Sequence, residues 1–112
     1  MVFFEKVDWL VFSGYYAHMN RTQFQVQLPV IILKEGKRFV AYSPVVDLST
    51  SGTTKQQAQR RFGEMLSLFF EGLIQRNTLD EVLTGLGWRK VRRLWEPPVI
   101  VSHNTQKIAV AV

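Results

Sequence analysis

The sequence predicts an α+β fold in which an antiparallel three-stranded meander carries one long helix, followed by a short helix and additional C-terminal strands. Two observations predict it. Apolar runs on either side of a Gly-containing turn indicate a β-hairpin, and apolar residues then recur at helical spacing for about twenty residues. The chain has 112 residues, of which 46% are hydrophobic, and is expected to form a single domain, 1–112, with one modest core.

The strands are predicted from alternation and from turn residues. Phe24–Leu33 is predicted as one strand with an edge or bulge at Pro29, because proline cannot donate to a β-ladder. Gly36 supplies a hairpin turn, Arg38–Tyr42 forms the second strand, and Val45–Ser51 forms a short third strand.

The long helix has clear end signals. Thr54 and Gln57 match a capping box, and Asn77 can take the left-handed conformation that ends a helix. Its apolar face is predicted to consist of Ala58, Phe62, Met65, Leu66, Phe69 and Leu73.

A second capping box, Thr78–Glu81, predicts a short helix that ends at Gly85 and Gly87, with Trp88 anchoring it to the core. Further on, Pro97–Pro98 forms a stiff hinge before two apolar segments that are predicted to be strands of a C-terminal hairpin. These segments are Val99–Val101 and Ile108–Val112. The expected layout is an extended N-terminal segment (1–22), a core (23–88) and a basic strand with this hairpin (89–112).

A basic run follows Trp88 and gives the candidate contact residues Arg89, Lys90, Arg92 and Arg93. The net charge of +5 makes nucleic-acid contact one interpretation of this run. In that interpretation the flanking Trp88 and Trp95 stack on bases while the cations contact phosphates. The alternative is an edge strand that is protected from aggregation by its charge.

The sequence suggests no catalytic, cofactor or metal site, so we expect a non-enzymatic protein. There is no cysteine, and of the acidic residues only Asp47 falls on a predicted central strand. His18 and His103 lie in separate loops without metal-ligand spacing. No apolar run approaches the ~18 residues of a membrane span, and a cytoplasmic location is expected.

One set of residues resembles a known family. The residues are Tyr42, Ser43, Pro44, Asp47, Leu48, Thr50, Gly52, Thr54 and Ala58, and their order and spacing resemble the HicB antitoxin family. The resemblance covers roughly 25–88 and implies a truncated ribonuclease H-like fold. It also implies a protein-binding function, in which the chain neutralises a small toxin ribonuclease by direct binding.

The chain departs from the family pattern at Val45, where an acidic residue is usual, and at Ser51, where Gln is common. It also shows no C-terminal helix-turn-helix or ribbon-helix-helix module, so we expect no sequence-specific DNA binding by this chain alone. Two alternatives stay open: a nucleic-acid-binding protein that uses the basic run 89–93, and an orphan self-associating scaffold of the same fold.

Self-association is predicted from the long helix. Phe70 and Ile74 fall outside its apolar stripe, so packing on a single sheet leaves both in water. Burying each is worth ~1.5–3 kcal/mol. We therefore expect a homodimer, or a higher symmetric assembly, with Phe70 and Ile74 as candidate contacts.

Overall fold

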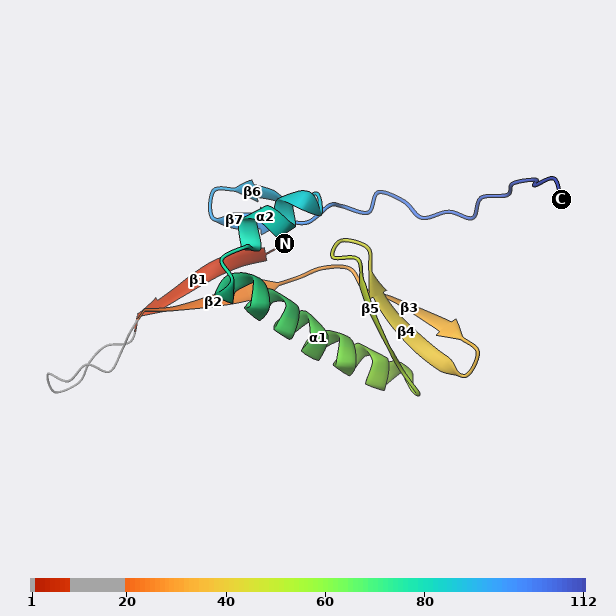
Figure 1. Cartoon of the computed structure of the whole chain (residues 1–112), viewed down its shortest axis with the longest axis horizontal. Coiled ribbons are helices and arrows are strands. Elements are labelled where there is room, and N and C mark those ends of the chain that lie inside the picture. The colour runs from red at the N-terminus through yellow and green to blue at the C-terminus, as the bar shows by residue number, and fades with distance from the viewer. Residues whose placement is uncertain (1, 9–19) are drawn as a thin grey trace, which may run out of the picture.

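The computed structural model describes residues 2–8 and 20–112 (Figure 1). It has two antiparallel sheets and two helices, so the predicted α+β class is confirmed. The first sheet is a meander of β3 (Ile31–Glu35), β4 (Arg38–Ser43) and β5 (Leu48–Gly52). The second has the strand order β2-β1-β7-β6, formed by β1 (Val2–Asp8), β2 (Asn20–Val26), β6 (Arg89–Val91) and β7 (Leu94–Glu96). The helices are α1 (Lys55–Gln75) and α2 (Leu79–Gly85).

The prediction of one continuous strand over Phe24–Leu33 is wrong. The chain leaves β2 after Val26, passes through residues 27–30 without regular structure, and enters β3 at Ile31 in the other sheet. Pro29 lies in this break, which agrees with its inability to donate to a ladder. Proline therefore marks the boundary between two sheets rather than a bulge within one strand.

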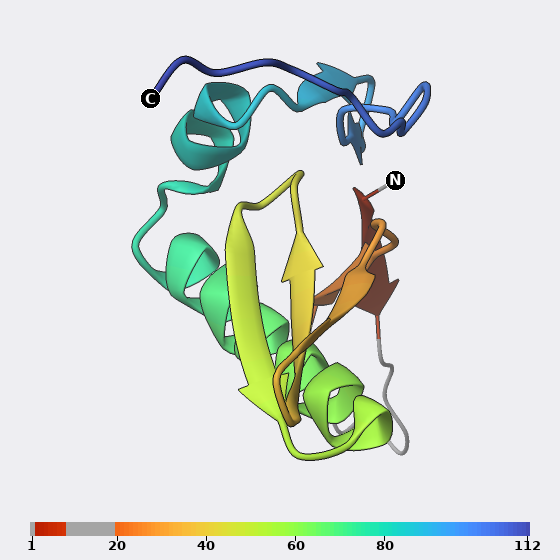
Figure 2. The ribbon, with the colours of Figure 1, turned by 90° about the vertical axis from the view of Figure 1, so that its right-hand side faces the viewer.

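Helix α1 lies across one face of the meander, mainly over β5 and β4 (Figure 2). The side chains of Ala41 and Ser43 on β4 are fully buried beneath it, at 0% exposure. Because strand side chains alternate between faces, the neighbouring Val40 and Tyr42 point to the opposite face. The meander therefore has one covered face and one outer face.

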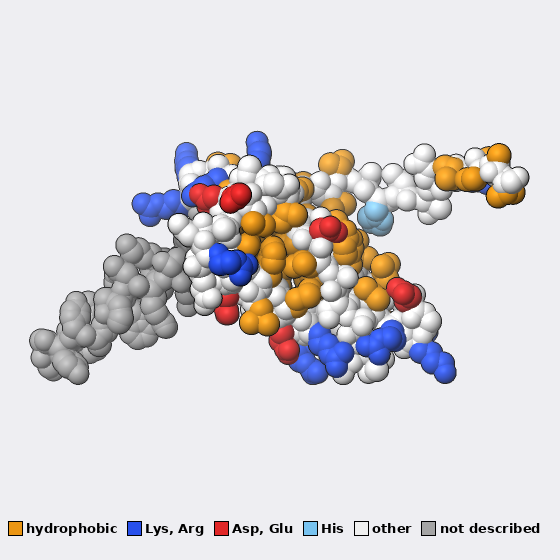
Figure 3. Space-filling model, viewed as in Figure 1, with side chains coloured by type: hydrophobic (Ala, Val, Ile, Leu, Met, Phe, Trp, Pro, Cys, Tyr) orange, Lys and Arg blue, Asp and Glu red, His pale blue; other side chains and the backbone are white. Residues whose placement is uncertain are grey.

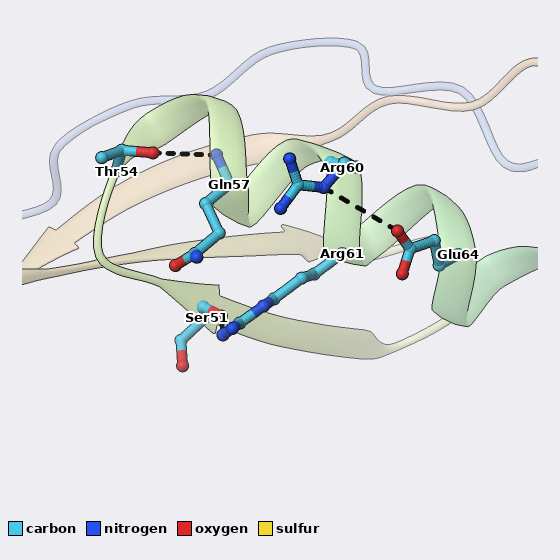
Figure 4. Close-up of polar contacts among 6 residues, drawn as sticks. All are labelled: Ser51, Thr54, Gln57, Arg60, Arg61 and Glu64. Atoms are coloured by element: carbon cyan, nitrogen blue, oxygen red, sulfur yellow. Dashed lines mark hydrogen bonds and ion pairs between the residues drawn. The ribbon is translucent and has the colours of Figure 1, made fainter.

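The corner between β5 and α1 forms as predicted. Gly52 comes so close to the helix that a Cβ there would lie 2.7 Å from the backbone nitrogen of Ala58, which is itself fully buried. The Gln57 backbone N–H donates to Thr54 Oγ1 at 3.0 Å, which caps the helix (Figure 4). The Gln57 side chain reaches back one residue further than in a standard capping box, and its Oε1 accepts the Thr53 backbone N–H at 2.6 Å.

Asn77 ends α1 in the left-handed conformation that the sequence predicted, with φ 59°. The Thr78 backbone N–H donates to the Leu73 carbonyl at 2.9 Å, and the Asn77 N–H donates to the Ile74 carbonyl at 3.1 Å. These two bonds make a Schellman motif. The predicted capping box at Thr78 does not form: its side chain makes no capping hydrogen bond to α2, and its hydroxyl donates to the Leu73 carbonyl at 3.4 Å.

Trp88 joins the end of α2 to the meander. Its side chain is 2% exposed, and its Nε1 donates to the Val45 carbonyl at 2.7 Å, across 43 positions of sequence. A second Schellman motif, closed by Gly87 at φ 90°, ends α2 and turns the chain toward Trp88. The predicted anchoring role of Trp88 is therefore confirmed.

The C-terminal region differs from the prediction. The additional C-terminal strands are β6 and β7, whereas Val99–Val101 and Ile108–Val112 form no strand in this chain. Residues 97–112 instead form an extended tail that begins against residues 27–29 and then runs away from the body (Figure 1). Strand β1 pairs with both β2 and β7, so residues 2–8 and the β6–β7 hairpin lie in one sheet. Of the helices in the described residues, neither is long and apolar enough to cross a bilayer.

The contribution of the Trp88 hydrogen bond can be isolated with a second tryptophan. We expect Trp88→Phe to destabilise the protein by about 1–3 kcal/mol more than Trp95→Phe, because only the first leaves a buried carbonyl unpaired. Trp95 is also 2% exposed, but its Nε1 has no hydrogen-bond partner among the described residues. Urea unfolding of both variants measures the difference, and equal losses would contradict this role of the bond.

Candidate interaction surface

The basic run forms a tight hairpin rather than one continuous strand. Lys90 pairs with Trp95, and Val91 pairs with Leu94, so the two-residue turn consists of Arg92 and Arg93. Arg92 has φ 61°, a left-handed conformation that most side chains disfavour. The turn places both guanidinium groups at the tip of the hairpin, where both residues are exposed.

Two of the four candidate cations are already engaged within the chain. Arg89 forms an ion pair with Glu96 across the hairpin, at 3.6 Å. Lys90 Nζ lies 3.7 Å from an Asp80 carboxylate oxygen and 5.6 Å from the centre of the Trp95 ring. Arg92 and Arg93 form no ion pair with any residue that the structure describes.

The tryptophans beside the run do not form a platform for bases. Trp88 and Trp95 are each 2% exposed, so neither presents a ring face to a nucleic acid. The prediction that these two tryptophans stack on bases is therefore wrong. What remains of the nucleic-acid interpretation is the positive charge at the hairpin tip.

A hollow of about 410 Å³ brings together two sequence-predicted contact residues from separate segments. Its lining consists of Ile74, Asn77, Leu79, Asp80 and Lys90, contributed by the end of α1, the start of α2 and β6. Ile74 is 45% exposed and forms an apolar part of its surface, while the Asp80–Lys90 ion pair contributes charge at its rim. This combination of an exposed apolar side chain and flanking charges is typical of a protein contact site.

Phe70, unlike Ile74, is buried. Its side chain is 4% exposed, and its ring packs edge-on against Phe69 at 5.2 Å and against Trp88 at 6.2 Å between centroids. The expectation that Phe70 needs a second subunit to cover it is wrong, because the segment carrying Trp88 covers it within the chain. Of the two candidate self-association residues, only Ile74 stays available.

The sequence did not single out Leu68, although it is 69% exposed on α1. The sequence could have identified it by its position on the helix, because Leu68 comes four residues after Glu64 and lies between the apolar stripe and the polar face. The exposed carboxylates of α1 and of the first turn of α2 are Glu64, Glu71, Asp80 and Glu81. In the view of Figure 3, cations gather at the upper left and at the lower right, whereas acidic side chains are scattered beside and between these groups.

A second group of cations lies near the end of β5 and the first turns of α1, and no single basic run in the sequence predicted it. The Arg38 side chain donates to Ser51 Oγ at 3.2 Å, and the Arg61 Nη1 donates to the Ser51 carbonyl at 3.1 Å. Lys37 and Lys55 are exposed nearby in sequence. The residues come from three elements, so only folding brings them together.

Among the side chains that the structure describes, the candidate acidic and histidine residues do not gather into one site. Asp47 lies in the turn before β5, not on a central strand, and accepts a hydrogen bond from the Tyr42 hydroxyl at 3.1 Å. This bond raises the pKa of Tyr42 above its usual value of 10.0. Within residues 2–8 and 20–112, no three His, Asp or Glu side chains gather where a metal ion would fit. His103 is in the tail, and His18 lies outside the described residues.

The free charge at the hairpin tip gives a salt-dependent prediction. We expect only weak, non-specific binding to duplex DNA of mixed sequence, because the described residues present no recognition helix. Replacing Arg92 and Arg93 with Ser lowers the slope of log K against log salt concentration by roughly 1 per residue. Fluorescence anisotropy measures this, and Lys37→Ser with Lys55→Ser removes the same charge elsewhere as the control.

A complex that survives moderate salt and prefers one DNA sequence would contradict this prediction.

Comparison with known proteins gives no match for this chain: none with a protein-family model, none with a curated protein and none with a solved structure.

Proposed function

We propose that this chain is a non-enzymatic protein-binding module that neutralises a small toxin ribonuclease by direct contact, as the resemblance to HicB antitoxins implies. The strand-strand-strand-helix order supports this proposal, as does the Gly52–Thr54–Ala58 corner on which the resemblance depends. This element order and this corner were both predicted from the sequence, and both are present in the structure. The ribonuclease H-like relationship of the core belongs to the same proposal.

The observation that carries the proposal is the hollow at the end of α1. It offers the side chain of Ile74 to a partner, beside the Asp80–Lys90 ion pair. An apolar centre with charges at its rim suits a partner that inserts one apolar side chain and aligns its own charges around it.

The charge distribution supports a basic partner. The chain carries +5 overall, which alone disfavours contact with another basic protein. However, Asp80 lines the hollow, and the exposed Glu71 and Glu81 are close to its lining residues in sequence. Arg92 and Arg93, which form no ion pair with any described residue, lie at the hairpin tip. A basic toxin would therefore approach the helical side of the molecule against little repulsion.

We further propose that the chain forms a homodimer. Ile31 and Leu33 leave apolar surface in water on β3, at 41% and 49% exposure. The tail adds six more exposed branched residues, which are Val99, Ile100, Val101, Ile108, Val110 and Val112. Exposed apolar surface of this extent favours association. Nucleic-acid binding as the main function has weaker support, because Lys90 is paired and both flanking tryptophans are buried.

Co-expression tests the toxin-binding function. We expect the chain to co-purify with a small basic ribonuclease encoded in the adjacent reading frame and to restore growth to cells that express it. Ile74→Asp abolishes both effects, since it places a charge on the apolar surface of the hollow. Leu68→Asp is the matched control, because Leu68 is exposed on the same helix but does not line the hollow.

Thermal unfolding of both variants is the control for folding, and each is expected to keep a cooperative transition. Unchanged toxicity in the presence of the unmodified chain would sink the toxin-binding proposal.

A further inference from the structure

The tail has the composition of a β-strand but pairs with no strand among the described residues of its own chain. Its branched apolar residues are 82% exposed at Val99, 92% at Val101, 73% at Ile108 and 71% at Val110. In the last five residues, Ile or Val alternates with Ala, which would place Ile108, Val110 and Val112 on one face of a strand. Beyond Glu96 the tail has no acidic residue.

The meander offers an unprotected edge. Strands β3 and β5 are its two outer strands, because the order is β3-β4-β5. Strand β5 is short and polar along Ser49, Thr50 and Ser51, whereas β3 begins with Ile31, Ile32 and Leu33. Ile31 and Leu33 are 41% and 49% exposed. An apolar edge strand of this kind is a template for pairing with another strand.

A hollow lies beside this edge on the helix side of the sheet. It measures about 300 Å³, and its lining consists of Leu28, Val30, Gln59, Phe62, Gly63 and Leu66. It exists because α1 packs mainly over β4 and β5 and barely reaches β3. Gly63 leaves it open, since a Cβ there would meet no atom within 4 Å. A strand added next to β3 would direct every second side chain into this hollow.

We propose that residues 108–112 of one copy add as a strand to the β3 edge of a second copy, and that the second copy returns its own tail in the same way. Ile108, Val110 and Val112 enter the hollow beside Gly63, while Ala109 and Ala111 lie on the outer face near Ile31 and Leu33. The main-chain hydrogen bonds give affinity and the hollow gives specificity, as in other cases of strand addition.

The occupant is a second copy because of where the tail leaves the body. Its root, from Pro97 to Ile100, lies against residues 27–29, just before β3. From there it continues outward in extended form, clear of its own β3 (Figure 1). The stiff Pro97–Pro98 pair fixes the direction in which the tail leaves this root. One chain thus carries both donor and acceptor, and mutual exchange about a two-fold axis closes the assembly.

This inference rests on the proposed homodimer and specifies its interface. Light scattering of the full chain at micromolar concentration is expected to give twice the monomer mass of 13.0 kDa. Val110→Asp on the donor side, or Gly63→Met on the acceptor side, is expected to raise the dimer dissociation constant about 100-fold. Val110→Ile and Gly63→Ala are the matched controls and keep the dimer.

Mixing the two defective variants is the sharper measurement. The Gly63→Met chain still has a working tail and the Val110→Asp chain a working edge, so the mixture is expected to recover dimers through one exchange. A merely misfolded variant would not be rescued. A dimer that Val110→Asp leaves intact would overturn the tail exchange while the homodimer stands, and a monomeric full chain would overturn both.

Cysteine cross-linking separates exchange between copies from docking within one chain. Because the chain has no cysteine, Val30→Cys and Val110→Cys can be placed in two differently tagged chains. Exchange is expected to give a disulfide-linked pair of the two chains after oxidation. If the double variant instead cross-links within a monomer and the single variants do not link, the tail folds back on its own edge and the proposal is wrong.

Discussion

The close approach of β5 to α1 at Gly52 is the constraint on which the other features depend. No side chain fits between the two backbones, because a Cβ at Gly52 would lie 2.7 Å from the Ala58 nitrogen. Thr54 and Gln57 then hold the first turn of the helix at this corner. The 21 residues of α1 extend from this fixed start, so the corner sets the course of the helix over β5 and β4.

The path of α1 over β5 and β4 produces two surfaces. At the far end of α1, the Schellman motif at Asn77 turns the chain into α2, and the Trp88 hydrogen bond to Val45 returns it to the meander. The hollow around Ile74 forms between these elements. Along the other side, the helix leaves the β3 edge uncovered, with the hollow beside Gly63. The position of α1 thus produces both proposed contact regions, the hollow around Ile74 and the uncovered β3 edge.

Local signals in the sequence predicted the local features correctly. The cap at Thr54, the left-handed end at Asn77 and the tight corner at Gly52 each depend on residues within a few positions of one another. The anchoring of Trp88 was also predicted, since a large aromatic residue after a helix end seldom stays in water. Each of these features involves a residue type with a narrow physical role.

Features that depend on distant parts of the chain were missed. A helical wheel left Phe70 exposed because it considers one sheet under one helix, whereas the segment carrying Trp88 folds over from the other side. Alternation continued through Gln27 and Leu28, so it did not show that the chain changes sheets there. The turn at Arg92 lacks Gly or Asn, and the two hollows combine residues from several elements, so no local pattern marked them.

The role of the corner can be measured directly by comparing two glycines close to or within α1. Gly52→Ala is expected to lower the free energy of unfolding by at least about 2 kcal/mol, because the sheet and the helix must move apart. Gly63→Ala is expected to raise it by about 0.5–1 kcal/mol, since its Cβ meets nothing and alanine favours the helix. If chemical denaturation shows that Gly52→Ala is tolerated as well as Gly63→Ala, the corner does not determine where the helix lies.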